Sequence, residues 1–334
     1  MVKMPLECSF SESNWNVLAR YWHPVAYSHE IVNTPIATQL LDLRLVLFRD
    51  KNDRICAANN RCPHRGASLA EGWLEDGQLV CAYHGLMFDS EGACVRIPAA
   101  GDRAKIPAKL CLDLARAEEK YGIVWVCLSD SPMQSIPTFD AWDTMGIQRG
   151  RVSTEWHACP MRHAENFSDV AHAAWIHAET FAPRDYPEID TYKVTDHSYG
   201  LSFELPTTFL ASNTFEAKRK QLIETSKSSY RIFMPFTTHL KVAMSAGEEH
   251  IFDTVQPITA KKIRIFQLKT RNFDLHSPAD DWIAFQEMVN EEDRITVENQ
   301  QPLQMPLNLS EDFHLRADAF SVAYRRKLLS IGLA

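Results

Sequence analysis

Two short cysteine–histidine motifs constrain this sequence of 334 residues more than any other feature does. Residues 62–64 read Cys-Pro-His, and after sixteen intervening residues, residues 81–84 read Cys-Ala-Tyr-His. Glycines stand beside both motifs and give the backbone the freedom that chelating loops use. Each loop offers one thiolate and one imidazole, so the two loops can enclose a metal centre from opposite sides. The four candidate ligands are Cys62, His64, Cys81 and His84.

Two kinds of metal centre use this ligand set. A structural zinc ion takes two cysteines and two histidines in a tetrahedron. In a Rieske [2Fe–2S] centre, two imidazoles replace two thiolates on one of the irons. A short zinc finger usually has two or more residues between its first two ligands, whereas only Pro63 separates them here. The spacing therefore favours the iron–sulfur centre, and a zinc site or four ordinary core residues stay as alternatives.

A second candidate site lies in residues 165–177, which lack glycine and proline and are predicted to form a helix. His172 and His177 could bind one Fe(II) together with a carboxylate, the facial-triad arrangement. Positions five apart on an ideal helix point about 140° away from each other. A helix break or a π-bulge between the two histidines is therefore expected. Taken alone, two such histidines are more often ordinary half-buried residues.

The carboxylate has to come from elsewhere, and the helical pattern over residues 279–300 offers three. The expected inward-facing residues of this helix are Trp282, Phe285 and Val289. Asp293 and Glu292 fall on the two flanks of that stripe, while Glu291 points away from it. Periodicity thus leaves Glu292 and Asp293 open as the third ligand.

The cysteine–histidine motifs, each followed by glycine, resemble the signature of Rieske-type non-haem iron oxygenases. By this resemblance Cys62 and Cys81 bind one iron of the cluster, while His64 and His84 bind the other. The resemblance also suggests that Tyr83 donates its hydroxyl to a cluster sulfur and so tunes the cluster's potential. Simple packing of the Tyr83 ring is the alternative.

The second segment is similar to the iron motif of the same family at Asn166, Asp169, His172 and His177. The resemblance implies that His172 and His177 bind a mononuclear Fe(II). It implies that Asp169 bridges an iron-binding histidine to a Rieske histidine of a neighbouring subunit, within a ring-shaped homotrimer. It also favours Asp293, because the family's last ligand lies in an acidic cluster followed by a basic residue, here Arg294.

The implied activity is that of the terminal oxygenase component of a multicomponent system. Such a component takes O2 and electrons from an NAD(P)H-dependent reductase, directly or through a ferredoxin, and oxidises a small aromatic or heterocyclic molecule. The compact length and the pair Gly85-Leu86 after the last cluster motif resemble the vanillate and dicamba O-demethylase branch, which favours monooxygenation or oxidative demethylation. Ring-dihydroxylating relatives usually have Trp at the position of Leu86. A cis-dihydroxylating dioxygenase, a non-enzymatic Rieske electron carrier and a zinc-stabilised binding protein are the alternatives.

The order of patterns predicts an α+β chain with two domains. By resemblance, residues 1–133 form an all-β Rieske [2Fe–2S] domain, and residues 134–334 form a helix-grip-like catalytic domain with an antiparallel sheet and helices. The boundary is placed where Pro132 and Pro137 interrupt the pattern. Predicted strands cover residues 41–48, 122–128, 201–205, 240–244 and 263–268.

Composition excludes several partners. The formal net charge of −8 gives no electrostatic reason to expect nucleic acid. No apolar run approaches the roughly 20 residues that a membrane span requires. The first residues show no apolar signal-peptide core, so a cytoplasmic location is expected, with the eight cysteines reduced or ligated.

Overall fold

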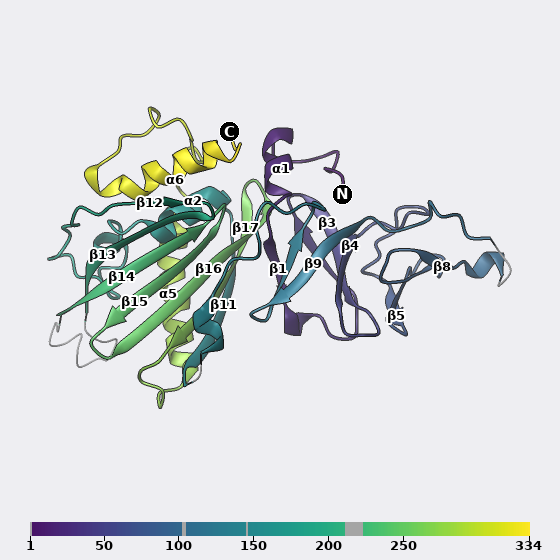
Figure 1. The fold of residues 1–334 in the computed structure, drawn as a ribbon, viewed down its shortest axis with the longest axis horizontal. Helices are drawn as coiled ribbons and strands as arrows, with labels where there is room; N and C mark the ends of the chain where they lie inside the picture. The colour runs from purple at the N-terminus through teal and green to yellow at the C-terminus, as the bar shows by residue number, and fades with distance from the viewer. Residues whose placement is uncertain (1, 102–104, 145, 211–222) are drawn as a thin grey trace. The chain divides into compact units, whose positions relative to one another are not determined.

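The computed structural model describes residues 2–101, 105–144, 146–210 and 223–334 of the chain. The chain divides into two units, Met1–Ile136 and Pro137–Ala334, each of which is described by itself. The boundary predicted after residue 133 lies just before the division after Ile136. The predicted α+β class, with an all-β first part and a second part of antiparallel sheet and helices, is confirmed (Figure 1).

The first unit contains two antiparallel sheets and a short helix α1 (Glu12–Leu18). The larger sheet has the order β1-β10-β9-β4-β3-β2. Its strands are β1 (His23–Tyr27), β2 (Ile36–Leu40), β3 (Leu43–Arg49), β4 (Ile55–Asn59), β9 (Leu114–Lys120) and β10 (Ile123–Cys127). The smaller sheet consists of β5 (Trp73–Glu75), β6 (Gln78–Val80), β7 (Met87–Phe88) and β8 (Cys94–Arg96). The two cysteine–histidine motifs lie before and within this smaller sheet, in the loop after β4 and the turn between β6 and β7.

The second unit is built on one antiparallel sheet of seven strands, in the order β11-β17-β16-β15-β14-β13-β12 (Figure 1). The strands are β11 (Gln148–Trp156), β12 (Thr195–His197), β13 (Gly200–Leu210), β14 (Ile223–Phe233), β15 (Thr237–Met244), β16 (Gly247–Thr259) and β17 (Lys262–Arg271). The helices are α2 (Pro160–Ser168), α3 (Ala173–Ile176), α5 (Ala279–Val297) and α6 (Ala319–Ser330).

The helices α2 and α5 pack on the same face of this sheet. Thr238, Asp253 and Gln267 stand side by side on β15, β16 and β17, so their side chains leave the same face. Ser168 and His163 of α2 contact the first two of these side chains, and α5 contacts the third. The two helices that carry the candidate iron-binding residues therefore lie on one face of a wide sheet.

The single helix predicted over residues 165–177 is wrong. Helix α2 ends at Ser168, and the four-residue helix α3 begins at Ala173. The carboxylate of Asp169 accepts a hydrogen bond from the backbone N–H of Ala171 at 2.9 Å, a local turn that competes with helix continuation. This interruption precedes both histidines.

The C-terminal helix α6 is fixed to α2 by a buried ion pair. The Arg325 guanidinium donates to both carboxylate oxygens of Glu165, at 2.8 and 3.1 Å, and to Asp312 at 2.5 Å. The Arg325 side chain is only 4% exposed and that of Glu165 only 11%. Glu165 precedes Asn166, so this pair also fixes the helix turn that carries one residue of the candidate iron motif.

An Arg325→Ala variant is expected to lose about 3–5 kcal/mol of unfolding free energy, because the buried Glu165 carboxylate then loses both hydrogen bonds from the guanidinium and keeps only Arg162, 3.8 Å away. Chemical denaturation of the purified protein measures this loss. A Lys262→Ala variant is the control, since Lys262 pairs with Glu155 at the surface and such pairs contribute about 0–1 kcal/mol. Equal losses in the two variants would contradict a structural role for the buried pair.

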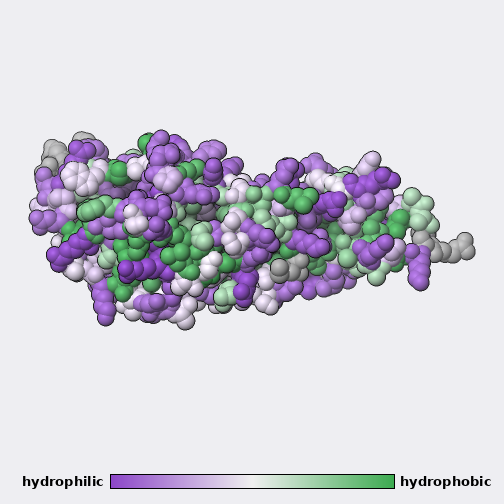
Figure 2. Space-filling model, turned by 90° about the horizontal axis from the view of Figure 1, so that it is seen from above, coloured by the Kyte–Doolittle hydropathy of each residue, from purple (hydrophilic) through white to green (hydrophobic). Residues whose placement is uncertain are grey.

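Hydrophilic side chains cover most of the face seen in Figure 2, with hydrophobic ones in groups between them. No helix in the part of the chain that the structure describes is long and apolar enough to cross a membrane.

Candidate metal centres

The two cysteine–histidine loops of the first unit have the same backbone geometry. In the first loop the Gly66 N–H donates to the Cys62 carbonyl at 2.9 Å, and in the second the Gly85 N–H donates to the Cys81 carbonyl at 2.9 Å. Both glycines have a left-handed backbone, with φ of 76° and 67°, which a side chain would strain. Two matching turns thus present one cysteine and one histidine each.

The thiols and the imidazoles of these loops differ in exposure. Cys62 and Cys81 are 2% and 1% exposed, whereas His64 and His84 lie at the surface with their ring centroids 4.6 Å apart. Burial, followed by the neighbouring Cys81 thiol, raises the pKa of the Cys62 thiol to about 11, so binding a metal here would release protons. A centre held by all four side chains would have a buried thiolate side and an exposed imidazole side.

The arrangement fits a two-iron cluster better than one zinc ion. The four donor atoms around a single tetrahedral zinc lie within about 4 Å of one another. Among the residues that the structure describes, only one group of three or more His, Cys, Asp or Glu side chains has all of its donor atoms within 4.8 Å of one another. That group lies in the second unit. No three of the four cysteine–histidine ligands meet this condition, as expected where two pairs bind two different irons.

Tyr83 is 62% exposed, and its ring packs on that of His84 with centroids 3.9 Å apart. This contact agrees with the packing alternative. The hydrogen bond from its hydroxyl to a cluster sulfur stays a prediction.

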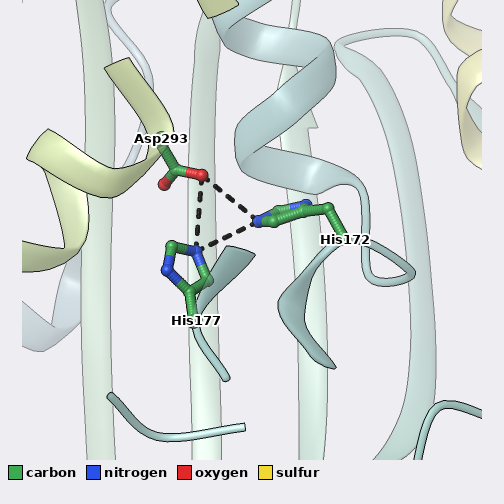
Figure 3. A group of neighbouring side chains, drawn as sticks. All are labelled: His172, His177 and Asp293. Atoms are coloured by element: carbon green, nitrogen blue, oxygen red, sulfur yellow. Dashed lines mark hydrogen bonds and ion pairs between the residues drawn. The ribbon is translucent and has the colours of Figure 1, made fainter. Parts of the chain in front are cut away.

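In the second unit, the structure brings His172, His177 and Asp293 together (Figure 3). The Nε2 atoms of the two histidines are 3.2 Å apart, and each is 3.3 Å from Oδ1 of Asp293. Three donors at right angles around an ion, each about 2.1 Å away, would be about 3.0 Å from one another. Two imidazoles and one carboxylate on one side of a shared point therefore fit Fe(II), with other positions open.

The short helix α3 explains how residues five apart can meet. His172 and His177 flank its single turn, and His177 has φ of −101° and ψ of 23°, outside the helical region. No π-bulge lies between the histidines, but the helix ends at Ile176, before His177, so the expected helix break is present there. The ideal angular spacing therefore does not hold for the two rings.

The other two residues of the motif surround the same three side chains. The Asn166 amide donates to Oδ1 of Asp293 at 3.2 Å. Oδ2 of Asp169 lies 3.5 Å from Nδ1 of His172, and the Asp169 side chain is 31% exposed. Asp169 thus stands between His172 and the surface.

Glu292 does not join the three donors. Its carboxylate lies 2.7 Å from Nδ1 of His177, the nitrogen that faces away from Asp293, and it also accepts a hydrogen bond from Thr180. A carboxylate on the outer nitrogen fixes the tautomer and the ring orientation of a metal-binding histidine. Sequence reasoning placed Glu292 on the flank of the helix but missed this role and Thr180 altogether, since no pattern marks a threonine in a turn.

The charges of the three donors suit a cation. Burial opposes ionisation of Asp293, but hydrogen bonds from His172 and His177 outweigh it and hold the Asp293 pKa well below its usual range. Burial likewise opposes protonation of His172, yet the adjacent Asp169 and Asp293 raise its pKa to about 10. A divalent ion would take the place of the proton on Nε2, which faces Asp293, while Nδ1 keeps its proton beside Asp169.

A Glu292→Gln variant is expected to bind its mononuclear iron about tenfold more weakly, the lower end of the effect of losing an outer partner of a ligand. The iron content after dialysis against graded free Fe(II) measures this change. Because the side-chain amide of this variant would still contact His177, complete loss of the iron would show that Glu292 is itself a ligand.

Comparisons with known proteins agree with both centres. Residues 21–109 match the Rieske [2Fe-2S] domain, and residues 156–331 match the C-terminal domain of the vanillate O-demethylase oxygenase. The chain belongs to the Rieske oxygenase family. As a Rieske oxygenase it uses a [2Fe–2S] cluster and a mononuclear non-haem iron. It is a terminal oxygenase component that carries out monooxygenation or oxidative demethylation, as predicted.

Relatives of this Rieske oxygenase cover nearly its whole length. It is 30% identical to methylxanthine N1-demethylase NdmA of Pseudomonas putida, over 93% of this chain and 88% of that protein. It is also 30% identical to methylxanthine N3-demethylase NdmB of the same organism, over 92% and 88%. The solved structure of NdmA with caffeine superposes with a TM-score of 0.85 at 28% identity, covering 95% of this chain and 92% of that one.

Proposed function

We propose that this oxygenase removes a methyl group from a nitrogen of an N-methylated heterocycle. The observation that supports the proposal is the 30% identity to two methylxanthine N-demethylases along nearly the entire chain. The reaction consumes an N-methyl compound, O2, two electrons and two protons, and it yields the N–H compound, formaldehyde and water. O-demethylation is the second candidate, favoured by the match of residues 156–331 to a vanillate O-demethylase domain.

His172, His177 and Asp293 are proposed to hold the mononuclear iron, which when bound supplies the activation of O2. Asn166 holds the Asp293 carboxylate in place, and Glu292 holds the ring of His177. The Phe181 ring stacks on that of His177 with centroids 4.8 Å apart, and Phe285 lies 6.3 Å further along. These two aromatic rings make one side of the centre apolar, which limits the access of water.

Cys62, Cys81, His64 and His84 are proposed to hold the [2Fe–2S] cluster. Its exposed histidine side suits electron exchange with a partner surface. Asp169 touches His172 and is partly exposed, as a bridge between subunits requires. We therefore propose a homotrimer in which each cluster serves the iron of the neighbouring subunit, with electrons from an NAD(P)H-dependent reductase, directly or through a ferredoxin.

A single-turnover experiment tests the proposed reaction without a known reductase. The protein is loaded with both metal centres and reduced with dithionite. Excess reductant is removed, and the protein is mixed with O2 and caffeine, or with O2 and vanillate. We expect formaldehyde and a demethylated methylxanthine from caffeine, in an amount approaching one per mononuclear iron. Formaldehyde from vanillate alone would favour O-demethylation, and formaldehyde from neither would contradict both candidates.

A further inference from the structure

A chain of buried polar side chains connects α2 to α5 through the sheet, one helical turn away from the contact that holds the iron ligand. Nε2 of His163 on α2 lies 2.9 Å from Oδ1 of Asp253 on β16. The other carboxylate oxygen of Asp253 accepts from the Gln267 amide on β17 at 2.9 Å. Gln267 and Asn290 of α5 exchange two hydrogen bonds, at 2.8 and 3.2 Å. These four residues are called the cross-sheet network below.

The cross-sheet network connects α2 to α5 three residues before the place where Asn166 of α2 contacts Asp293 of α5. His163 precedes Asn166 by three positions on α2, and Asn290 precedes Asp293 by three positions on α5. Residues three apart lie on the same helix face. The two helices are therefore joined by two parallel connections, the direct contact of Asn166 with Asp293 and the cross-sheet network beside it.

The network is buried almost completely. His163, Asp253 and Gln267 are 2%, 1% and 0% exposed, and Asn290 is 6% exposed. Asn290 also accepts a hydrogen bond from Gln286 at 3.0 Å, which extends the network along α5. Burying so many polar groups adds little net stability compared with apolar packing, but hydrogen bonds between buried polar side chains restrict how their partners can be arranged.

We propose that the cross-sheet network positions Asp293 for iron binding by fixing the rotation and the axial position of α5 relative to α2. A shift of α5 by a single residue would move Asp293 by about 1.5 Å and rotate it by about 100°. Displacements of about 1 Å at a reacting centre cost roughly a hundredfold in rate. Asn290 and Gln267 are thus positioning residues for a centre that they do not touch. The inference rests on the proposed role of Asp293 as an iron ligand.

The network variant is Asn290→Leu, which keeps the size of the side chain but removes the connection between α5 and the sheet. The control is Thr254→Val. Thr254 follows Asp253 on β16, its side chain leaves the opposite face of the sheet, and it hydrogen-bonds to Thr237 at 2.7 Å. Both variants lose a buried hydrogen bond of the same sheet, but only the first loses a contact with a helix of the iron site.

The measurement is binding of Fe(II) to protein stripped of its mononuclear iron by a chelator, by anaerobic equilibrium dialysis and metal analysis. Thermal unfolding of the stripped proteins is measured alongside. We expect iron binding about 10- to 100-fold weaker in Asn290→Leu and within about threefold of wild type in Thr254→Val. In an Asp253→Asn variant the amide oxygen can accept from Gln267 and the amide NH2 can donate to Nε2 of His163, so this variant should also bind iron within about threefold of wild type.

Three outcomes separate the possibilities. If Asn290→Leu binds iron as Thr254→Val does, the positioning role is wrong while the iron site stands. If iron binding in all variants simply follows their melting temperatures, the network acts on stability alone and the proposal is overturned. If the stripped wild-type protein takes up no iron at all, the proposed iron site itself fails.

Discussion

An Asp293→Ala variant is expected to keep its [2Fe–2S] cluster, lose its mononuclear iron and lose substrate oxidation by about a thousandfold or more. Asp293 provides the only carboxylate among the three donors, and its removal leaves two neutral imidazoles for a divalent ion. A bound metal contributes several kcal/mol to a reaction of this type, and each 1.36 kcal/mol is about tenfold in rate. Iron per chain and product per chain are the two quantities to measure.

The matched control is Glu291→Ala on the same helix. Glu291 is exposed and forms an ion pair with Arg294. This pair lies away from the two histidines. We expect this variant to keep its iron and an activity within about twofold of wild type. Retention of the mononuclear iron in Asp293→Ala would show that another carboxylate completes the site.

An Asp169→Asn variant is expected to keep all of its iron but to transfer electrons from the cluster to the mononuclear site about a hundredfold more slowly. The substituted amide has nearly the same shape as the carboxylate, but it lacks the negative charge that now lies 3.5 Å from Nδ1 of His172. Loss of an outer partner of a ligand costs up to about a hundredfold in activity. Stopped-flow reoxidation of the reduced cluster, in the presence of substrate and O2, measures this step.

The control for Asp169→Asn is Glu179→Gln, which neutralises an exposed carboxylate shortly after His177. Its cluster should be reoxidised at the wild-type rate. If Asp169→Asn also reoxidises at that rate, electrons reach the iron by another route. If its iron content falls instead, Asp169 acts on metal binding and not on electron transfer.

The cluster loops were predictable because their signal is local. The ligand spacing and the glycines at 66 and 85 lie within single turns, and the structure gives both turns the same geometry. The interruption after Ser168 was not predictable from composition. It depends on a hydrogen bond from the Ala171 N–H to the Asp169 side chain, in a segment that lacks both glycine and proline.

The choice between Glu292 and Asp293 could be made only from the three-dimensional structure. Both residues lie on the flanks of one helical stripe. Only the position of His177 shows that Asp293 is one of the three donors and that Glu292 contacts the outer nitrogen of His177.

Of the strands beneath the iron site, β15 and β17 were predicted in part, over residues 240–244 and 263–268, whereas β16 was missed. Asp253, Thr254 and Gln256 are buried on β16, and these polar side chains hide the alternation that marks a half-buried strand.

The most direct test of two metal centres is analysis of iron and acid-labile sulfide in anaerobically purified protein, with an EPR spectrum after reduction. The account predicts about three irons and two sulfides per chain, with a Rieske-type signal that a Cys62→Ala variant lacks. Zinc without sulfide, and no such signal, would contradict it.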